Sequence, residues 1–289
     1  MVEIVRAGDW SVGTITEREG PQRRPHELFP GIDRAAASRV LEGFSNSSFA
    51  PATGRLFHTY QSFVLRTPGQ TILIDTCVGE HKARPPHFNF PKQDWLDAFA
   101  AEGLSVEDID VVINTHLHVD HVGWNTVLED GRWVPTFPNA KYYFGQSEFE
   151  FWDGQARKGF DLPARILADS VNPVIEAGKA ELVATNFRLN EHIWFEPAPG
   201  HTPGQFVVHV QAGAKKIVFA TDAVHHPLQI AFPQFSTIFC EDKEQAVRTR
   251  LDLLTAVADT DTILVPEHFA YPVAGRVVRE GTGFGYVYL

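Results

Sequence analysis

A short apolar run that leads directly into a group of histidines is the feature that most constrains this chain. The run IDVVIN, residues 109–114, is almost continuously hydrophobic, which is typical of a strand buried on both faces. His116, His118, Asp120 and His121 follow it closely, although the chain has only 13 histidines in all. Because sites in α/β proteins gather at strand ends, the sequence predicts a polar site at the C-terminal end of a buried strand.

The spacing of these four side chains suits metal binding. His116 and His118 are separated by one residue, so in an extended segment their imidazoles point to the same side. Asp120 and His121 come where the chain bends, and they point to a second position nearby. Two interpretations are open at this stage, a polar loop and a loop that supplies ligands to two adjacent metal ions.

Three more candidate ligands stand in similar places further along the chain. His201 lies in the turn PAPGHTPG, Asp222 follows the apolar run VFAT, and His268 follows the apolar run ILVPE. Each has an ordinary explanation by itself, as a turn residue, a helix cap or a buried histidine. Their repeated position at strand ends favours one shared metal site. Imidazole nitrogens and carboxylate oxygens without a thiolate suit Zn²⁺, and also Fe, Mn or Co.

The remaining pattern predicts an α/β protein. Two β-rich runs, residues 60–66 and 70–75, flank a Thr-Pro-Gly turn and predict a hairpin. Ser147 is a candidate N-cap for a helix that begins SEFEFWD. No linker divides the chain, so we expect a single domain over residues 1–289, with residues 1–55 as an N-terminal arm or cover.

Composition and charge work against several classes of partner. The net charge of −11, without a basic run, disfavours binding to nucleic acid. No stretch approaches the roughly 18 apolar residues of a membrane span, and the first residues lack the apolar run of a signal peptide. The spacing of Cys77 and Cys240 indicates neither a disulfide framework nor a thiolate metal site. We therefore expect a cytoplasmic protein that binds neither nucleic acid nor a membrane.

Four motifs together resemble the metallo-β-lactamase superfamily. THLHVDHVG, PGHTPG, ATDA and PEHF occur in the order of that family, between about residues 57 and 270, and DTCVG resembles its early Asp-x-Gly turn. The resemblance implies an αββα sandwich, in which two mixed sheets pack face to face with outer helices, and a two-metal site at one edge. It further implies that His116, His118 and His201 hold one ion, that Asp120, His121 and His268 hold the other, and that Asp222 bridges them.

The family chemistry implies hydrolysis. Two ions share a hydroxide that attacks the substrate while one ion polarises its oxygen, and Asp120 orients the hydroxide. His118 stands where the oxygen-reducing diiron members have a glutamate, and true β-lactamases lack the carboxylate of Asp222. Acyl-homoserine lactonases have a tyrosine three residues after the bridging aspartate. In this chain His225 occupies that position, and the tract PLQIAF follows it. Both features are more similar to the methyl parathion hydrolase-like branch.

The predicted function is therefore hydrolysis of a lactone or carboxylic ester with an apolar portion. His225 is a candidate catalytic donor to the substrate oxygen or the leaving group, although His225 and His226 also read as exposed loop residues. The alternatives that stay open are a phosphotriester hydrolase, a glyoxalase II-like thiolesterase, a mono-iron sulfur dioxygenase and a non-catalytic metal-stabilised protein. A homodimer is a further expectation, and two roles are open for the arm, contact with a partner subunit and a place at the border of the site.

Aromatic residues near the candidate ligands are open to two interpretations. Either they pack in the core or they line an apolar substrate cleft. They are Phe88, Phe90, Trp124, Phe232, Phe235 and Phe239.

Overall fold

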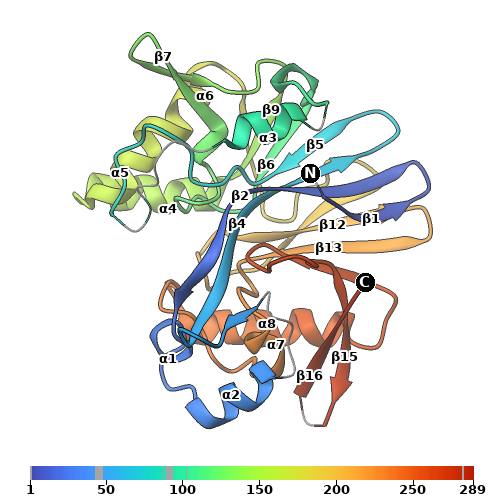
Figure 1. Cartoon of the computed structure of the whole chain (residues 1–289). Helices are drawn as coiled ribbons and strands as arrows, with labels where there is room; N and C mark the ends of the chain where they lie inside the picture. Colours follow the sequence, from blue (N-terminus) through green and yellow to red (C-terminus); the bar gives the residue numbers. More distant parts are fainter. Residues whose placement is uncertain (1, 43–47, 87, 89–93, 102, 282) are drawn as a thin grey trace. The chain divides into compact units, whose positions relative to one another are not determined.

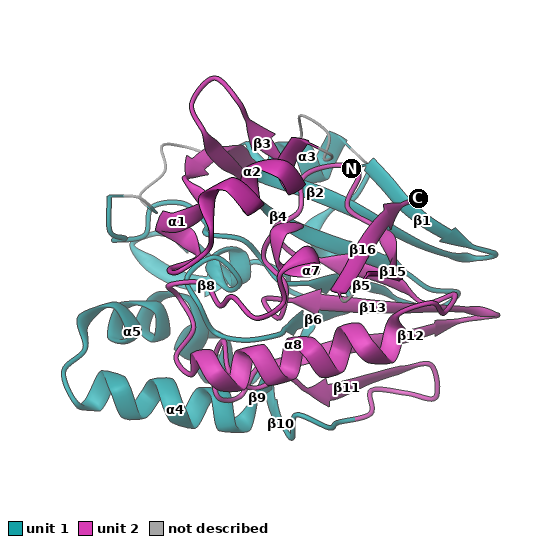
Figure 2. Ribbon diagram, turned by 90° about the horizontal axis from the view of Figure 1, so that it is seen from below, with its two compact units in different colours: residues 1–17, 60–187 teal, residues 18–59, 188–289 magenta. Residues whose placement is uncertain are grey.

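The chain divides into two compact units, each built from two separate segments. The computed structural model describes residues 2–42, 48–86, 88, 94–101, 103–281 and 283–289 (Figure 1). Unit 1 comprises residues 1–17 and 60–187, and unit 2 comprises residues 18–59 and 188–289 (Figure 2). The long strands β2 (Trp10–Arg23) and β4 (Arg55–Arg66) run from one unit into the other. The expectation of a single domain stays a prediction.

Unit 1 is organised around a mixed sheet with β6 near its middle. The order of the strands is β1-β2-β4-β5-β6-β9-β10. Beside β2 and β4, these strands are β1 (Val2–Ala7), β5 (Thr71–Ile74), β6 (Val111–Asn114), β9 (Lys141–Gly145) and β10 (Ala180–Val183). β6 pairs in parallel with both β5 and β9, and all four of its residues are buried. The prediction of a buried strand is confirmed.

The predicted hairpin is the antiparallel pair β4 and β5. Phe63 faces Ile74 and Arg66 faces Thr71 across the pair. The turn is closed because the Thr67 amide donates to the Gln70 carbonyl at 2.9 Å. This hairpin places the residues that follow β5 beside the end of β6.

Aromatic side chains fill the core of unit 1. Trp95 stacks on Trp124 with ring centroids 5.3 Å apart, and Phe99 and Phe137 pack against Trp95. Trp124 is therefore a core residue rather than part of a cleft, and its indole nitrogen donates to Glu17 at 2.7 Å. The outer elements are the helices α3 (Trp95–Ala101), α4 (Gln146–Arg157), α5 (Asp161–Ile166) and α6 (Asn172–Glu176), a π-helix (Leu167–Val171) and the ribbon of β7 (Thr126–Glu129) and β8 (Arg132–Pro135).

One capping prediction is wrong. The helix α4 begins at Gln146, and its N-cap is Gly145, which has no side chain to cap the helix. Ser147 is instead a residue of the first turn, because β9 runs directly into α4 through Gly145 and leaves no extended residue at position 147.

A buried ionic group fixes the segment that follows β5. Arg84 donates to both carboxylate oxygens of Asp169, each at 2.7 Å. The Lys82 ammonium donates to the Thr126 hydroxyl at 2.7 Å and to the Asp169 carbonyl at 3.1 Å. All three charged side chains are buried, so two cations share one carboxylate inside unit 1.

In the described residues of unit 2, a second mixed sheet is accompanied by four helices. Its strand order follows the sequence, β11 (Ile193–Pro197), β12 (Phe206–Ala212), β13 (Lys215–Thr221), β14 (Ile263–Pro266), β15 (Gly275–Glu280) and β16 (Gly283–Tyr288). Only β13 and β14 pair in parallel, so these two neighbours end at the same edge. The helices are α1 (Pro25–Leu28), α2 (Arg34–Glu42), α7 (Leu228–Ala231) and α8 (Lys243–Val257), and the short strand β3 (Phe49–Ala50) pairs with β4.

The N-terminal arm packs against the segment after β13. Leu28, Phe29 and Leu41 form a buried cluster with Leu228 of α7, and the partly buried rings of Phe232, Phe235 and Phe239 pack against it. These three phenylalanines therefore join the arm to α7, while Phe90 lies outside the described residues. None of the helices built from described residues has the length and apolar character needed to cross a membrane.

Candidate metal centre

The loop after β6 carries the unit 1 group of candidate ligands. The loop folds back on itself because the His121 amide donates to the His118 carbonyl at 3.1 Å. The His121 carbonyl in turn accepts from the Thr76 amide at 2.9 Å and from the Asn114 side chain at 2.5 Å. The chain is thereby held in a tight turn, with His116 and His121 buried.

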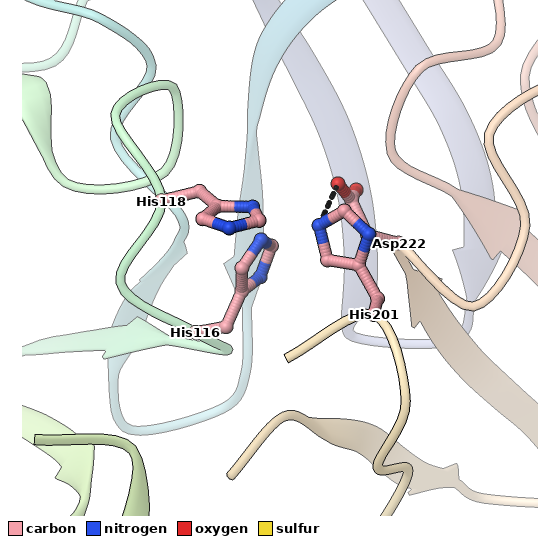
Figure 3. A group of neighbouring side chains, drawn as sticks. All are labelled: His116, His118, His201 and Asp222. Carbon is pink, nitrogen blue, oxygen red and sulfur yellow. Dashed lines mark ion pairs between the residues drawn. The ribbon is translucent and has the colours of Figure 1, made fainter. Parts of the chain in front are cut away.

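Three imidazole rings come together on this loop. The ring centroids of His116 and His118, both drawn in Figure 3, lie 4.8 Å apart. The ring centroids of His116 and His121 lie 3.9 Å apart. The Asp120 carboxylate lies 3.9 Å from Nε2 of His121. Unit 1 thus gathers the four residues that the sequence singled out first.

Asp75 orients this group, and sequence reasoning did not include it among the site residues. Its carboxylate accepts from the Thr115 amide at 2.8 Å and from the Thr115 hydroxyl at 2.7 Å. Its Oδ2 also lies 2.9 Å from Nδ1 of His121. A carboxylate that holds Nδ1–H leaves Nε2 as the metal-binding nitrogen of the ring. The available signal was the turn DTCVG, whose aspartate is Asp75.

The unit 2 group is centred on the buried carboxylate of Asp222. Nε2 of His201 lies 3.0 Å from Asp222 Oδ2, the ion pair dashed in Figure 3. Nε2 of His225 lies 3.1 Å from the same oxygen. Nε2 of His268 lies 3.0 Å from Oδ1. One carboxylate therefore collects three imidazole nitrogens.

Local backbone geometry brings these residues together. Asp222 and His268 follow the parallel neighbours β13 and β14, whose carboxyl ends share one edge. His201 follows Gly200, which has φ +127°, and a Cβ at Gly200 would lie 2.2 Å from the Ala246 amide nitrogen. Glycine is therefore required there, because the turn approaches α8 too closely for any side chain.

In His268 and His201, Nδ1, the ring nitrogen that does not contact Asp222, also has a partner. Nδ1 of His268 lies 2.9 Å from the Thr59 carbonyl, to which it donates. Nδ1 of His201 lies 3.7 Å from the Cys240 sulfur. Both contacts direct Nε2 of the ring toward Asp222. Sequence reasoning missed Thr59 and treated Cys240 only as an isolated thiol, because neither is near its partner in the chain.

The imidazoles of His201 and His225 contact the same Asp222 oxygen, but their pKa values are shifted in opposite directions. Burial lowers the pKa of His201, but the Asp222 carboxylate outweighs burial and raises that pKa to about 10. Burial lowers the pKa of His225 to about 3 despite the same carboxylate. The Asp222 carboxylate therefore favours a positive charge beside it at His201, either a proton or a bound cation, whereas burial keeps His225 neutral.

His225 and His226 are not exposed loop residues. Their exposed fractions are 1% and 2%, so that interpretation is wrong. The backbone of His225 is held by Gln229, whose side-chain oxygen accepts from the His225 amide at 2.7 Å. His226 donates from Nε2 to the Ser48 carbonyl at 2.9 Å and accepts from the Leu228 amide at 3.1 Å. His226 thus ties the N-terminal arm to α7.

The burial of His226 predicts a pH-dependent stability. Burial lowers the pKa of His226 to about 4, below the 6.5 of an unperturbed histidine. The unfolded chain therefore binds more protons between these values, so this contribution to stability is complete above pH 6.5 and is lost as the pH falls toward 4. The unfolding free energy of the wild type relative to His226→Asn is expected to drop by on the order of 3 kcal/mol from pH 7 to pH 4.

Urea unfolding of both proteins at a series of pH values measures this difference. Metal release in acid affects both proteins alike and cancels in the comparison. A difference that does not change with pH would show that His226 does not titrate as its burial requires.

Comparison with known proteins identifies the class. The Metallo-beta-lactamase superfamily model matches residues 57–268, and the chain belongs to that superfamily. The solved structure of the hydrolase AbOPH in the beta lactamase superfamily has a TM-score of 0.83 at 23% identity, covering 100% of this chain and 97% of that one. The predicted α/β metallo-β-lactamase fold is confirmed.

More particular relatives are lactonases. N-acyl homoserine lactonase AttM of Agrobacterium fabrum is 27% identical over 175 residues, which are 54% of this chain and 59% of the lactonase. The match thus leaves about two fifths of that lactonase outside it. AidC, a dizinc quorum-quenching lactonase solved with the product N-hexnoyl-L-homoserine, has a TM-score of 0.80 at 22% identity, covering 99% of this chain and 96% of that one.

Proposed function

We propose that this protein is a hydrolase that uses two divalent metal ions to open a lactone or carboxylic ester that has an apolar portion. His116, His118 and His201 bind one ion, Asp120, His121 and His268 bind the other, and Asp222 is shared. The observation that carries the proposal is the Asp222 carboxylate, with three imidazole Nε2 atoms within 3.1 Å of its oxygens.

The donor chemistry of both groups fits such ions. Five imidazoles and two carboxylates, with no thiolate among them, suit Zn²⁺ and also Fe, Mn or Co. Asp75 holds the outer nitrogen of His121, and the Thr59 carbonyl holds that of His268. Outer contacts of this kind fix the tautomer and orientation of metal-binding histidines. The dizinc lactonase AidC, whose fold is similar, favours zinc.

Each residue has a separable chemical task. Bound divalent ions supply a nucleophilic water at neutral pH and a Lewis acid for the substrate oxygen. Asp120 orients the attacking water and accepts its proton. His225, which is neutral, donates a hydrogen bond to the substrate oxygen, and the proton that Asp120 accepts passes to the leaving group. The apolar portion of the substrate is inferred from Phe232, Phe235 and Phe239, which follow His225 closely in the chain and are only partly buried.

A phosphotriester hydrolase is the second candidate. The observation that favours it is His225 itself, which replaces the tyrosine of acyl-homoserine lactonases and resembles the methyl parathion hydrolase-like branch. A phosphoryl oxygen accepts the same hydrogen bond as an ester carbonyl. Only a direct comparison of substrates separates the two functions.

Metal analysis followed by a substrate panel tests the proposal. Protein prepared without chelators is expected to contain two transition-metal ions per chain. Among lactones, aryl esters, thioesters and phosphotriesters, lactones or aryl esters with an apolar chain are expected to have the highest kcat/KM. A single ion at saturating metal would contradict the two-metal proposal. A preference for a dianionic thioester would contradict the proposed substrate class and make the protein a thiolesterase.

Replacement of His225 is expected to lower the rate without loss of metal. His225→Ala should keep both ions and lose about 100-fold or more in kcat, because a hydrogen bond to the reacting oxygen is lost. His81→Ala, at an exposed histidine of unit 1, is the matched control and should match the wild type. The measurements are kcat and metal content of each variant.

Two outcomes would assign His225 differently. Loss of one ion together with the rate would make it a metal ligand, which its 3.1 Å approach to Asp222 permits. An unchanged rate with both ions retained would leave it as a packing residue.

A further inference from the structure

His58 and Thr59 lie side by side with His268 within unit 2. Both belong to β4, while His268 follows β14. The Thr59 amide donates to the His268 carbonyl at 3.3 Å, and Nδ1 of His268 donates to the Thr59 carbonyl at 2.9 Å. The two contacts fix the backbone of His268 and one edge of its ring.

The face of the His268 ring is covered by His58. The two imidazoles stack with centroids 4.0 Å apart and an angle of 22° between their planes. The side chain of His58 is buried, with an exposed fraction of 9%. A ring held only at one edge still turns about that hydrogen bond, whereas a ring that is also covered on its face does not.

The stacked arrangement argues against a shared ion. The lone pair of an imidazole nitrogen lies in the plane of its ring. Two nearly parallel rings therefore direct their lone pairs along nearly parallel lines rather than toward one point. His58 is thus placed to hold the His268 ring rather than to bind the same ion beside it.

We infer that His58 is a positioning residue, which sets the orientation of the His268 ring and so the affinity of the metal ion that His268 binds. The inference rests on the proposed function, because it assumes an ion at His268. A flat face is the property of His58 that matters. A phenyl ring supplies such a face without any ligand nitrogen.

Zinc titration of His58→Ala and His58→Phe against a competing chelator tests the inference. The wild-type holoprotein should give two stepwise dissociation constants. In His58→Ala, one constant is expected to rise by about 10- to 100-fold, as for the loss of other outer contacts to metal-binding histidines, while the other stays unchanged. His58→Phe should restore that constant to near the wild-type value.

A second comparison assigns the affected ion. His268→Ala should weaken the same constant, and adding His58→Ala to it should cause no further loss, because both changes act on one ring. Circular dichroism of each protein checks that it is folded.

Several results would overturn the role of His58. The first is a folded His58→Ala protein whose two zinc dissociation constants equal those of the wild type. The second is a His58→Ala protein in which both dissociation constants rise equally. The third is a His58→Phe protein that binds zinc as weakly as His58→Ala does. A wild-type protein that binds fewer than two ions would instead contradict the proposed function. The zinc titration of the wild type detects this result before any variant is made.

Discussion

Asp222→Ala is expected to lose one of two metal ions and at least about 100-fold of its turnover, both together. The carboxylate is buried and lies 3.0 to 3.1 Å from the Nε2 atoms of His201, His225 and His268. Two cations in one site repel each other, and a shared carboxylate offsets that repulsion. Without the carboxylate, its negative charge no longer offsets the repulsion between the two cations. The three imidazoles also lose the group that they all contact.

Two further variants make this result specific. Asp222→Asn keeps the shape of the side chain but not its charge, so it is expected to lose the second ion as well. Asp252→Ala, at an exposed carboxylate of α8, is the matched control and should keep metal content and kcat. Elemental analysis and kcat measured on the same preparations decide the matter. Two ions and full activity in Asp222→Ala would show that the bridging assignment is wrong.

Asp169→Ala is expected to destabilise the fold by about 3 to 5 kcal/mol. The Asp169 carboxylate accepts two hydrogen bonds from Arg84 and lies 3.8 Å from the Lys82 ammonium. Both cations are buried. Without Asp169 the Arg84 guanidinium has no carboxylate to compensate it, and Lys82, whose pKa is already lowered to about 7 by burial, loses its proton. The segment after β5 and the π-helix that contains Asp169 should separate first.

An exposed ion pair of the same type is the control. Asp153 and Arg157 form an i,i+4 pair on α4, with a distance of 2.8 Å, and the Arg157 side chain is 79% exposed. Asp153→Ala should therefore cost no more than about 0.5 kcal/mol. Urea unfolding of the metal-saturated proteins measures both changes. Equal, small effects would show that the buried group does not stabilise unit 1.

Local pattern was sufficient for the elements that the candidate site is built on. A continuous apolar run predicts a buried strand, and β6 has parallel strands at both edges and all four residues buried. Two β-rich runs on either side of Thr-Pro-Gly predict the β4–β5 hairpin, and its pairing confirms it. His116, His118, Asp120 and His121 are close in the chain, so their proximity is a property of one short loop.

Propensity was not sufficient where tertiary structure sets the boundary of an element. Serine is favoured as an N-cap, but Ser147 lies inside the first turn of α4, because β9 enters the helix through Gly145. The same holds for His226, whose polar character suggested exposure. Packing of the N-terminal arm buries it, and two hydrogen bonds satisfy its ring.

The sequence alone determined which residue types are available to bind metal and the strand ends at which they stand. Tertiary structure alone decided how those residues are held. Asp75 meets His121 from 46 positions away, and Thr59 meets His268 from 209 positions away. The physical reason is that hydrophobic periodicity acts over a few residues, whereas ring orientation depends on hydrogen bonds and stacking between strands distant in the chain. No local pattern records which distant carbonyl, carboxylate or ring will lie against a given imidazole.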